Sequence, residues 1–478
     1  MTEDIASFAR LDSFPYRHRL GEVMARPLVT GTEEMTAAAA CDLMAGTGVG
    51  SVVIVDSAGS AVGIVTERDI LRALSRVRAG VLDIPLSELM SGPVECVPAT
   101  GYLSLAIARM TRSGKRHLVV VDEDGRPAGI VSARSLLKLR SGEALMIGDD
   151  VSHAQSAGDL ARSRAALPAL AGALLADGVA GRDVASVISS VLRDMTARAA
   201  EIAQQTMAAD GWGTAPARFA LLVLGSGGRG ESLLAFDQDN ALVHEGTATD
   251  DVWFAEFGRR LNMTLAEAGI PLCEGDVMVR NPFWRRTMGG WEEEIRHWVF
   301  EPRMQTVMNV DIFFDFVPVL GDTAMAGRLK DYAIGTASTS AFFVQFLALN
   351  VAQMEIPLGI FGEFITTHGR LNAKKYGLLP LVSAARARAV KAGIRTPSTA
   401  GRYSALQEAG LLHRDDLASL LDCHETLLRA MLEQQLADLA AGLPPSARIE
   451  PRALPRAGQR RLKAAFKRIR ALKAVIGA

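Results

Sequence analysis

Cysteine is scarce in this chain of 478 residues, and its four cysteines lie far apart without a CxxC pair. A disulfide framework and a zinc cluster are therefore excluded, and a reducing cytoplasm is the expected compartment. The chain also has no excess of charge, because 52 Lys and Arg balance 53 Asp and Glu. This balance excludes a protein that works globally as a polycation on nucleic acid or on a membrane surface.

Long hydrophobic runs are missing as well. The richest apolar segment, residues 165–176, is shorter than the roughly 18–20 residues that span a bilayer. The first residues are acidic and lack the basic-then-apolar order of a signal peptide. The composition is that of a folded chain, and the length favours about three domains. We expect a cytoplasmic multidomain protein that contacts no membrane.

An internal repeat occupies the first part of the chain. Two stretches offset by 66 residues match without a gap, so that SVVIVD at 51–56 answers HLVVVD at 117–122, and GIVTERD at 63–69 answers GIVSARS at 129–135. Each copy has the pattern of a helix, a buried strand, a turn, a short strand and a closing helix. Because one such unit buries little surface, we expect the two copies to pack into one α/β module.

The repeat resembles a tandem pair of CBS domains covering about residues 14–140, on the duplicated Gly-hydrophobic-Val-Thr/Ser-x-x-Asp motif. The resemblance implies that Thr66 and Asp69 contact the ribose of an adenine nucleotide in the cleft between the copies. The second copy keeps Ser132 but has Ser135 in place of the acid. We therefore expect one competent adenine-nucleotide site. The alternative is a module that serves only for homodimerisation.

A glycine-rich turn follows an apolar strand at residues 219–224. Gly225 and Ser226 carry no bulky side chain, and Gly228 and Gly230 keep the approach open. Backbone N–H groups in such a turn can approach a phosphate, and a helix that begins there adds its N-terminal dipole. On its own, a turn of this kind commonly marks only a tight connection.

Acidic residues follow the turn. Asp237 and Asp239 are two apart, and in a strand such residues point to the same face. Their repulsion is relieved by Mg²⁺ or Mn²⁺ that bridges to triphosphate oxygens. The apolar run 310–317, expected as a neighbouring strand, offers Asp311 and Asp315 on one face as the third acid. An acid in a buried run is costly unless it is paired or bound to metal, and we prefer Asp315.

Together these residues resemble the nucleotidyltransferase superfamily of DNA polymerase beta, whose pattern is Gly-Ser, a spacer and Asp-x-Asp. The Gly-x-Gly-Arg-x-Glu portion is similar to the uridylyltransferase that modifies the nitrogen-regulatory PII protein. A bacterial family of nucleotidyltransferases that follow CBS domains is closer still. It shares DQDNAL at 237–242, Asn281-Pro282 with Trp284, and FFDF at 313–316.

The resemblance implies that a nucleoside monophosphate passes from an NTP to an acceptor hydroxyl, with release of pyrophosphate. In this scheme Gly225 and Ser226 hold the triphosphate. Arg229 offers positive charge to the phosphates, and Glu231 orients Arg229.

The same resemblance implies that Asp237 and Asp239 ligate Mg²⁺, and that Asp315 completes a metal shell or acts as general base. The likeness to the uridylyltransferase points to a protein side-chain hydroxyl as the acceptor. Two alternatives stay open. One is a non-catalytic regulator that binds nucleotide or a partner, and the other is a nucleotidyltransferase for small molecules.

The expected fold class is an α/β multidomain chain. The expected parts are a tandem CBS module, a helical linker, a polymerase-beta-like nucleotidyltransferase α/β domain and a C-terminal helical substrate-binding domain. Their boundaries are 14–140, 141–212, 213–335 and 336–478. We expect a homodimer formed through the CBS domains, and we do not expect nucleic acid as a partner.

Two further patterns favour packing over binding. Trp284, Trp291 and Trp298 are seven residues apart, which favours a packing stripe over base stacking by Trp284. From Arg448 onward the chain has ten basic residues and one acid. Apolar residues recur there at helical spacing, so we expect a helix whose basic outer face covers an apolar stripe, with binding of RNA or an acidic partner as the alternative.

Overall fold

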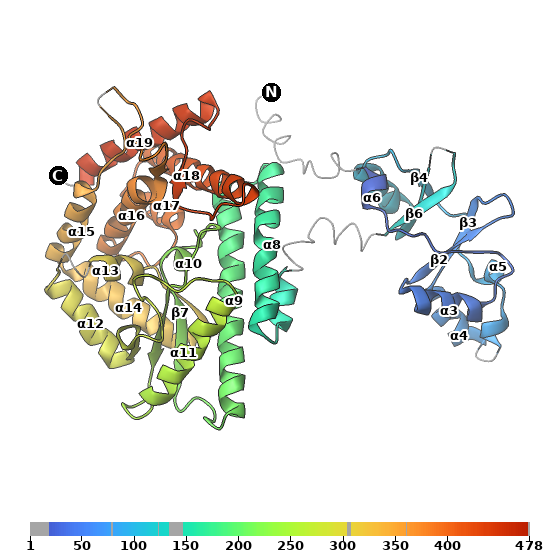
Figure 1. Ribbon diagram of the computed structural model, residues 1–478, viewed down its shortest axis with the longest axis horizontal. Helices are drawn as coiled ribbons and strands as arrows, with labels where there is room; N and C mark the ends of the chain where they lie inside the picture. Colours follow the sequence, from blue (N-terminus) through green and yellow to red (C-terminus); the bar gives the residue numbers. More distant parts are fainter. Residues whose placement is uncertain are drawn as a thin grey trace. The chain divides into compact units, whose positions relative to one another are not determined.

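The structure is a computed structural model that describes residues 19–77, 80–122, 124–132, 147–303, 307–359 and 361–476 (Figure 1). The chain divides into two compact units, Met1–Glu143 and Ala144–Ala478. Both units combine helices with small sheets, which confirms the α/β multidomain class. The helices expected in the linker pack into the same unit as all later parts of the chain. The expected boundaries within 141–478 stay predictions.

The first unit contains two copies of one three-stranded motif. The first copy has α2 (Leu20–Val23), β1 (Thr30–Gly31), α3 (Ala37–Thr47), β2 (Ser51–Val55), β3 (Ala61–Thr66) and α4 (Glu67–Val77). The second has α5 (Leu86–Leu89), β4 (Cys96–Pro98), α6 (Leu103–Ser113), β5 (His117–Val121) and β6 (Pro127–Ser132), after the short turn η2 (Val81–Asp83). In each sheet the first pair of strands is parallel and the second is antiparallel. The structure thus reproduces the repeat read from the sequence, except that the closing helix expected for the second copy lies outside the described residues.

The two copies exchange their first helical turns. A Cβ atom on Gly129 would lie 2.4 Å from Met24 Sδ, and one on Gly63 would lie 2.4 Å from Met90 Sδ. The methionine that opens each copy therefore packs on the third strand of the other copy, β6 for Met24 and β3 for Met90, where only glycine leaves room. Because each copy completes the packing of the other, we expect neither copy to be stable on its own.

The second unit is built on a four-stranded sheet in the order β10-β7-β8-β9. Its strands are β7 (Phe219–Val223), β8 (Asn240–His244), β9 (Arg285–Thr287) and β10 (Val317–Gly321). Every residue of β7 and β8 is buried, so both faces of the sheet are covered. Alternation divides the strands between two cores, with Leu221 and Leu242 in one and Leu222 and Val243 in the other.

Helices cover both faces of this sheet. The first core includes α8 (Ala157–Ala176), α9 (Gly181–Ala209) and α11 (Asp251–Glu267). The second includes α12 (Met288–Phe300), α13 (Val307–Phe313) and α14 (Thr323–Thr339). Trp284, Trp291 and Trp298 are at most 2% exposed, and Trp291 stacks on Phe313 at 4.7 Å. The packing stripe is confirmed, and Trp284 is too deeply buried to stack on a base.

The strand expected at residues 310–317 is wrong. Its first part is the end of α13, a turn follows, and β10 begins only at Val317. A continuous apolar run fits a buried helix as well as a buried strand, because neither shows alternation. Asp311 and Asp315 therefore do not lie on one strand face.

The C-terminal part is helical. It comprises α15 (Ala341–Gln353), the π-helix η5 (Lys374–Leu378), α16 (Leu379–Lys391), α17 (Thr399–Glu408), α18 (Arg414–Ala440), α19 (Arg456–Ile476) and the strand pair β11 (Leu371–Asn372) and β12 (Arg448–Ile449). Leu462, Phe466 and Ile469 of α19 are buried, which confirms its apolar stripe.

Within the described residues, no single helix meets the length and apolarity needed to cross a membrane; α14 and α15, bent by 89°, do so only as a pair.

The exchange of methionines can be tested with a pair of glycines. Gly129→Ala is expected to destabilise the first unit by roughly 1–3 kcal/mol, because its Cβ overpacks against Met24. Gly46→Ala, in the last turn of α3 with open space around it, is expected to stabilise by at most about 0.5–1 kcal/mol. Scanning calorimetry of the full chain measures both, and equal shifts for the two variants would contradict the exchanged packing.

Candidate active site

The glycine turn lies between β7 and the short helix α10 (Gly225–Arg229). Gly225 has a φ of +53°, and a Cβ there would lie 2.7 Å from Asp239 Oδ2. A Cβ on Gly228 would lie 2.1 Å from the carbonyl oxygen of Asp315. Gly225 is therefore required for its positive φ and for space, and Gly228 is required for space. The turn expected to hold phosphate lies directly against the carboxylate of Asp239.

Asp237 and Asp239 lie in an extended segment just before β8, with Asp237 exposed and Asp239 half-buried. The residue between them, Gln238, points the other way and is buried. Its amide nitrogen donates to the carbonyl oxygens of Asn262 (3.1 Å) and Ile270 (2.9 Å). The buried amide between the acids thus anchors the segment and holds both carboxylates on the opposite side.

A second amide completes this anchor. Asn262 of α11 donates its side-chain amide to the side-chain oxygens of Gln238 (2.9 Å) and Asn240 (3.1 Å). The side-chain oxygen of Asn240 also accepts from the Val279 N–H at 2.9 Å. The Gln and Asn of the DQDN string are thus structural, a role that the sequence analysis did not assign.

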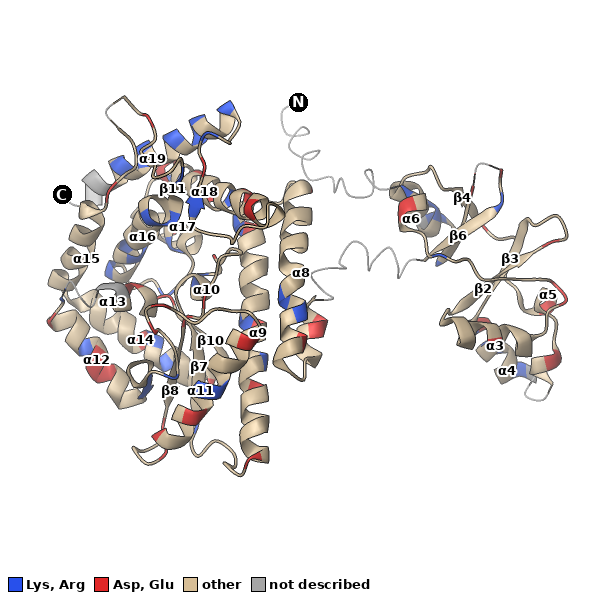
Figure 2. Cartoon of the chain, in the orientation of Figure 1, with Lys and Arg blue, Asp and Glu red and all other residues tan. Residues whose placement is uncertain are grey.

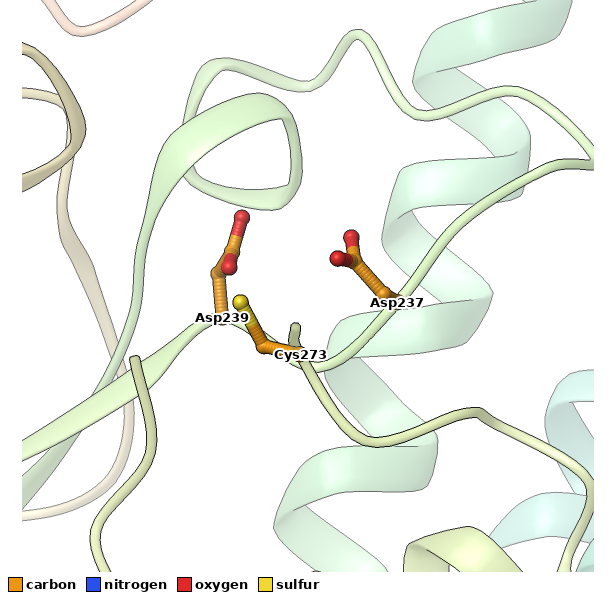
Figure 3. A group of neighbouring side chains, drawn as sticks. All are labelled: Asp237, Asp239 and Cys273. Atoms are coloured by element: carbon orange, nitrogen blue, oxygen red, sulfur yellow. The ribbon is translucent and has the colours of Figure 1, made fainter. Parts of the chain in front are cut away.

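Cys273 joins the two acids, as Figure 3 shows. One potential ligand atom from each of Asp237, Asp239 and Cys273 lies within 4.8 Å of the others. Burial and the charge of Asp237 raise the pKa of Asp239 to about 6. Burial and the charge of Asp239 raise the pKa of the Cys273 thiol to about 12. The group combines two mutually repelling carboxylates with a protonated thiol. The sequence analysis set Cys273 aside because it has no cysteine partner nearby.

Asp315 is not part of this group, and its assignment as a metal ligand is wrong. It is fully buried, and three guanidinium groups surround its carboxylate. Arg229 donates to Oδ2 at 2.6 Å, Arg386 donates to Oδ1 and Oδ2 at 3.1 and 2.5 Å, and Arg402 Nη1 lies 2.7 Å from Oδ1. Burial alone would raise the pKa of Asp315, but Arg386, Arg402 and Arg229 hold it far below its ordinary value. Both oxygens are therefore committed to arginines, and neither a metal nor a proton has access.

Arg229 is bonded on the protein side as well, and its expected contact with phosphates stays a prediction. Its Nε donates to Glu231 Oε2 at 2.6 Å, while its Nη1 donates to Asp315. Glu231 thus orients Arg229, as expected. The other oxygen of Glu231 accepts from the Thr399 N–H at 2.9 Å and lies 3.5 Å from His424 Nε2. Arg386 Nη1 also donates to Asp311 Oδ1 at 2.6 Å. We call Asp311, Asp315, Glu231, Arg229, Arg386 and Arg402 the arginine cluster; it joins the glycine turn to α16 and α17, and to α18 through the contact of Glu231 with His424.

Helix α9 supports the same turn from another side. Arg193 donates from Nε to the Gly227 carbonyl (2.7 Å) and from Nη2 to the Gly228 carbonyl (2.9 Å). The Ser189 hydroxyl accepts from the Ser232 N–H at 2.8 Å. A cavity of about 30 Å³ is lined by Ser226, Asp237 and Asp239, among others, and is too small to enclose a triphosphate. A nucleotide held at the turn would therefore extend beyond this cavity.

The regulatory residues are placed in the first unit. The Thr66 hydroxyl and N–H donate to Asp69 Oδ2 at 2.7 and 3.0 Å, which fixes this carboxylate. Burial lowers the pKa of His117 in the second copy, and the charge of Asp69 acts in the opposite direction. Asp69 therefore lies near the other copy. Ser132 ends β6 opposite His117, and Ser135 lies outside the described residues.

The arginine cluster gives a prediction that separates structural from metal-binding acids. Asp315→Asn is expected to destabilise the second unit by about 3–5 kcal/mol, because buried guanidinium groups lose their shared countercharge. Asp237→Asn, at an exposed position, is expected to stay within about 0.5 kcal/mol of the parent. Thermal unfolding of the full chain in chelator measures both. If Asp315→Asn is as stable as Asp237→Asn, Asp315 is not the centre of a structural cluster.

Family models match the chain in three parts. The model "CBS domain" matches residues 20–76 and 86–142. The model "Putative nucleotidyltransferase DUF294" matches residues 165–305, and "Putative nucleotidyltransferase substrate binding domain" matches residues 341–478.

Similar proteins match smaller parts. An uncharacterized protein of Methanopyrus kandleri is 32% identical over 120 residues, which are 25% of this chain and 61% of the relative. An uncharacterized 17.7 kDa protein of Acidianus ambivalens is 37% identical over 89 residues, 19% of this chain and 52% of the relative. The chain thus spans less than two thirds of the length of these two relatives.

Solved structures match about a quarter of this chain. A CBS domain protein from Pyrobaculum aerophilum, solved with AMP, is 32% identical, with a TM-score of 0.24, over 26% of this chain and 99% of the solved chain. A CBS-domain protein from Agrobacterium tumefaciens is 27% identical, with a TM-score of 0.24, over 26% and 98%. With its CBS pair, nucleotidyltransferase domain and substrate-binding domain in this order, the chain belongs to the CBS-linked nucleotidyltransferase family.

Proposed function

We propose that this chain transfers a nucleoside monophosphate from an NTP to an acceptor hydroxyl with the help of Mg²⁺ or Mn²⁺. The observation that carries the proposal is the contact between the glycine turn and the acid pair, since a Cβ on Gly225 would lie 2.7 Å from Asp239 Oδ2. A phosphate held at the turn is thereby next to a carboxylate that can share a cation with it. Transfer of a nucleotidyl group needs this adjacency.

The donor atoms fit a hard cation. Mg²⁺ takes one or two carboxylates from a protein and completes its shell with water and substrate phosphates, which is what Asp237 and Asp239 offer. A protonated thiol is a poor ligand for Mg²⁺, so Cys273 would border the ion rather than bind it. When bound, the cation would neutralise charge on the phosphates and lower the pKa of the acceptor hydroxyl.

The residues of the chain then have defined tasks. Gly225 and Ser226 present backbone N–H groups to the triphosphate, and the Ser226 hydroxyl, 3.3 Å from that of Ser232, sits at the edge of the turn. Arg193 and Arg229 keep the turn in place, and Arg229 also offers positive charge beside the acid pair. The acceptor approaches from the exposed side of Asp237. We further propose a protein side-chain hydroxyl as the acceptor, in line with the likeness to the uridylyltransferase.

One observation favours a second candidate, a nucleotide-binding regulator without catalysis. Three acids would indicate an intact catalytic site, but Asp315 is enclosed by arginines and leaves only Asp237 and Asp239 in the metal-competent group. A two-acid site still suits binding of a nucleotide with its cation. Turnover is therefore the measurement that decides between the two candidates.

For catalysis, Asp237→Ala and Asp239→Ala are each expected to lower NTP turnover about 100-fold or more, because the cation loses a carboxylate in the transition state. Glu433→Ala, which removes an exposed acid of α18, is the control and should keep full activity. The assay incubates each labelled NTP with Mg²⁺ and cell lysate. Label on a protein band supports a protein acceptor, and label on a metabolite supports a small one. No label from a folded parent chain rejects catalysis.

For regulation, we propose that the CBS pair binds one adenine nucleotide at Thr66 and Asp69, with Ser132 at the corresponding place in the second copy, and mediates a homodimer. Titration calorimetry with AMP, ADP and ATP should find one site. Asp69→Ala is expected to weaken binding at least tenfold, because the ribose loses a charged hydrogen-bond acceptor. Asp83→Ala, at an exposed position of η2, is the control. Binding that ignores Asp69→Ala rejects this site.

A further inference from the structure

Helix α19 has a stripe of basic residues on its outer side, visible as the blue bands of Figure 2. We call Arg456, Arg460, Lys463, Lys467 and Arg470 the basic stripe. Their spacings of four and three residues put them on one face of the helix, over about 21 Å at ~1.5 Å per residue. The stripe contains no acid, and in the described part of the chain none of its members forms an ion pair. Its charge is therefore uncompensated.

The stripe is held in one orientation. Leu462, Phe466 and Ile469 on the opposite face of α19 are buried, so the helix cannot roll its apolar side outward without losing this packing. Arg468, between the two faces, pairs with Asp416 of α18. The helix thus lies flat on its unit and offers its charges outward as a fixed row.

Apolar side chains protrude beside this row. Phe361 is 96% exposed and Ile365 is 57% exposed. They flank Glu363, whose carboxylate folds back, since a Cβ on Gly359 would lie 2.0 Å from its Oε1. The exposure of two large apolar residues so close together in the sequence needs an explanation, because each would gain from leaving water.

Direct contacts connect this protruding segment to α19. The rings of Phe364 and Phe466 are 6.5 Å apart, and Lys463 Nζ lies 5.2 Å from the centre of the Phe364 ring. Arg470 donates to the Leu358 carbonyl oxygen at 3.0 Å. The protruding residues and two members of the basic stripe therefore belong to one continuous surface.

We propose that this surface, the basic stripe with Phe361 and Ile365, docks the protein on a membrane that contains anionic phospholipid. The stripe would lie along the headgroups, and the two apolar side chains would enter the interfacial layer. A membrane satisfies both features at once. A nucleic acid could stack a base on the ring of Phe361 but would leave the Ile365 side chain in water. An acidic protein would need a pocket that fits the protruding ring of Phe361.

The net charge of the chain does not predict such a surface. Its 52 basic and 53 acidic residues cancel in the sum, whereas the fold segregates five basic residues on one helix face. This proposal departs from the expectation of no membrane contact, and it does not depend on nucleotidyl transfer.

The test is co-sedimentation of the full chain with vesicles at about 0.1 M salt. One set is pure phosphatidylcholine, and the other contains 30 mol% phosphatidylglycerol. We expect binding to the second set only, and loss of binding in high salt. Arg456→Gln with Arg460→Gln is expected to lower the partition coefficient about fivefold for each charge removed. Arg76→Gln with Arg112→Gln removes two exposed arginines from the first unit and should leave binding unchanged.

The apolar part has its own variants. Phe361→Ser is expected to lower binding to the anionic vesicles at least fivefold, whereas Leu71→Ser, at a 63% exposed position of α4, should not. Unfolding temperatures check that each variant is folded. The proposal is overturned if the parent chain ignores the anionic vesicles, if neutral vesicles bind equally, or if the control pairs lose as much binding. The proposal is also overturned if the chain binds no vesicles but binds RNA or polyglutamate, and this binding is lost in Arg456→Gln with Arg460→Gln. It is overturned as well if the chain is a dimer that Phe361→Ser dissociates.

Discussion

The burial of the Asp315 carboxylate among three guanidinium groups is the interaction on which the second unit depends. Asp315 precedes β10, Arg229 ends the glycine turn, and Arg386 and Arg402 come from α16 and α17. Charges of this kind are tolerated in a protein interior only when each finds its partner, so the elements must meet in one geometry. Lys330 shows the cost of an extra charge here: burial and the charge of Arg402 lower its pKa to about 7, although Asp315 acts in the opposite direction. The cluster therefore specifies how the helical part sits on the glycine turn.

Much of the fold could be predicted, because it depends on local or repeated patterns. The 66-residue repeat could be recognised without any knowledge of distant contacts. In the structure both copies even have the same shift in strand register, between Ile54 and Val55 and between Val120 and Val121. The glycine turn and the two acids beyond it are close in sequence, so their adjacency followed from one strand pairing. Spacing also revealed the tryptophan stripe and the apolar side of α19, since helical periodicity reports directly on burial.

The prediction failed where the outcome depended on partners that are distant in sequence. Asp315 has the residue type of a metal ligand and a buried position. Its partners Arg386 and Arg402 lie 71 and 87 positions further on, and no local sequence pattern predicts these contacts. The apolar run around it fits a helix or a strand equally well. Cys273 was missed for the related reason that its partners are carboxylates rather than cysteines. A buried charged residue can thus be recognised from sequence, whereas the choice between a metal and an arginine as its partner cannot.

Helix α9 connects the glycine turn to α18. The helix follows the CBS module in sequence by way of α8, and its N-terminal N–H groups at Gly181 and Arg182 donate to Glu425 of α18 at 2.7 and 3.0 Å. Further along, Arg193 donates to both carbonyls of the glycine turn. These bonds are short and directional, so a shift of α9 along its axis must either move the turn or break them.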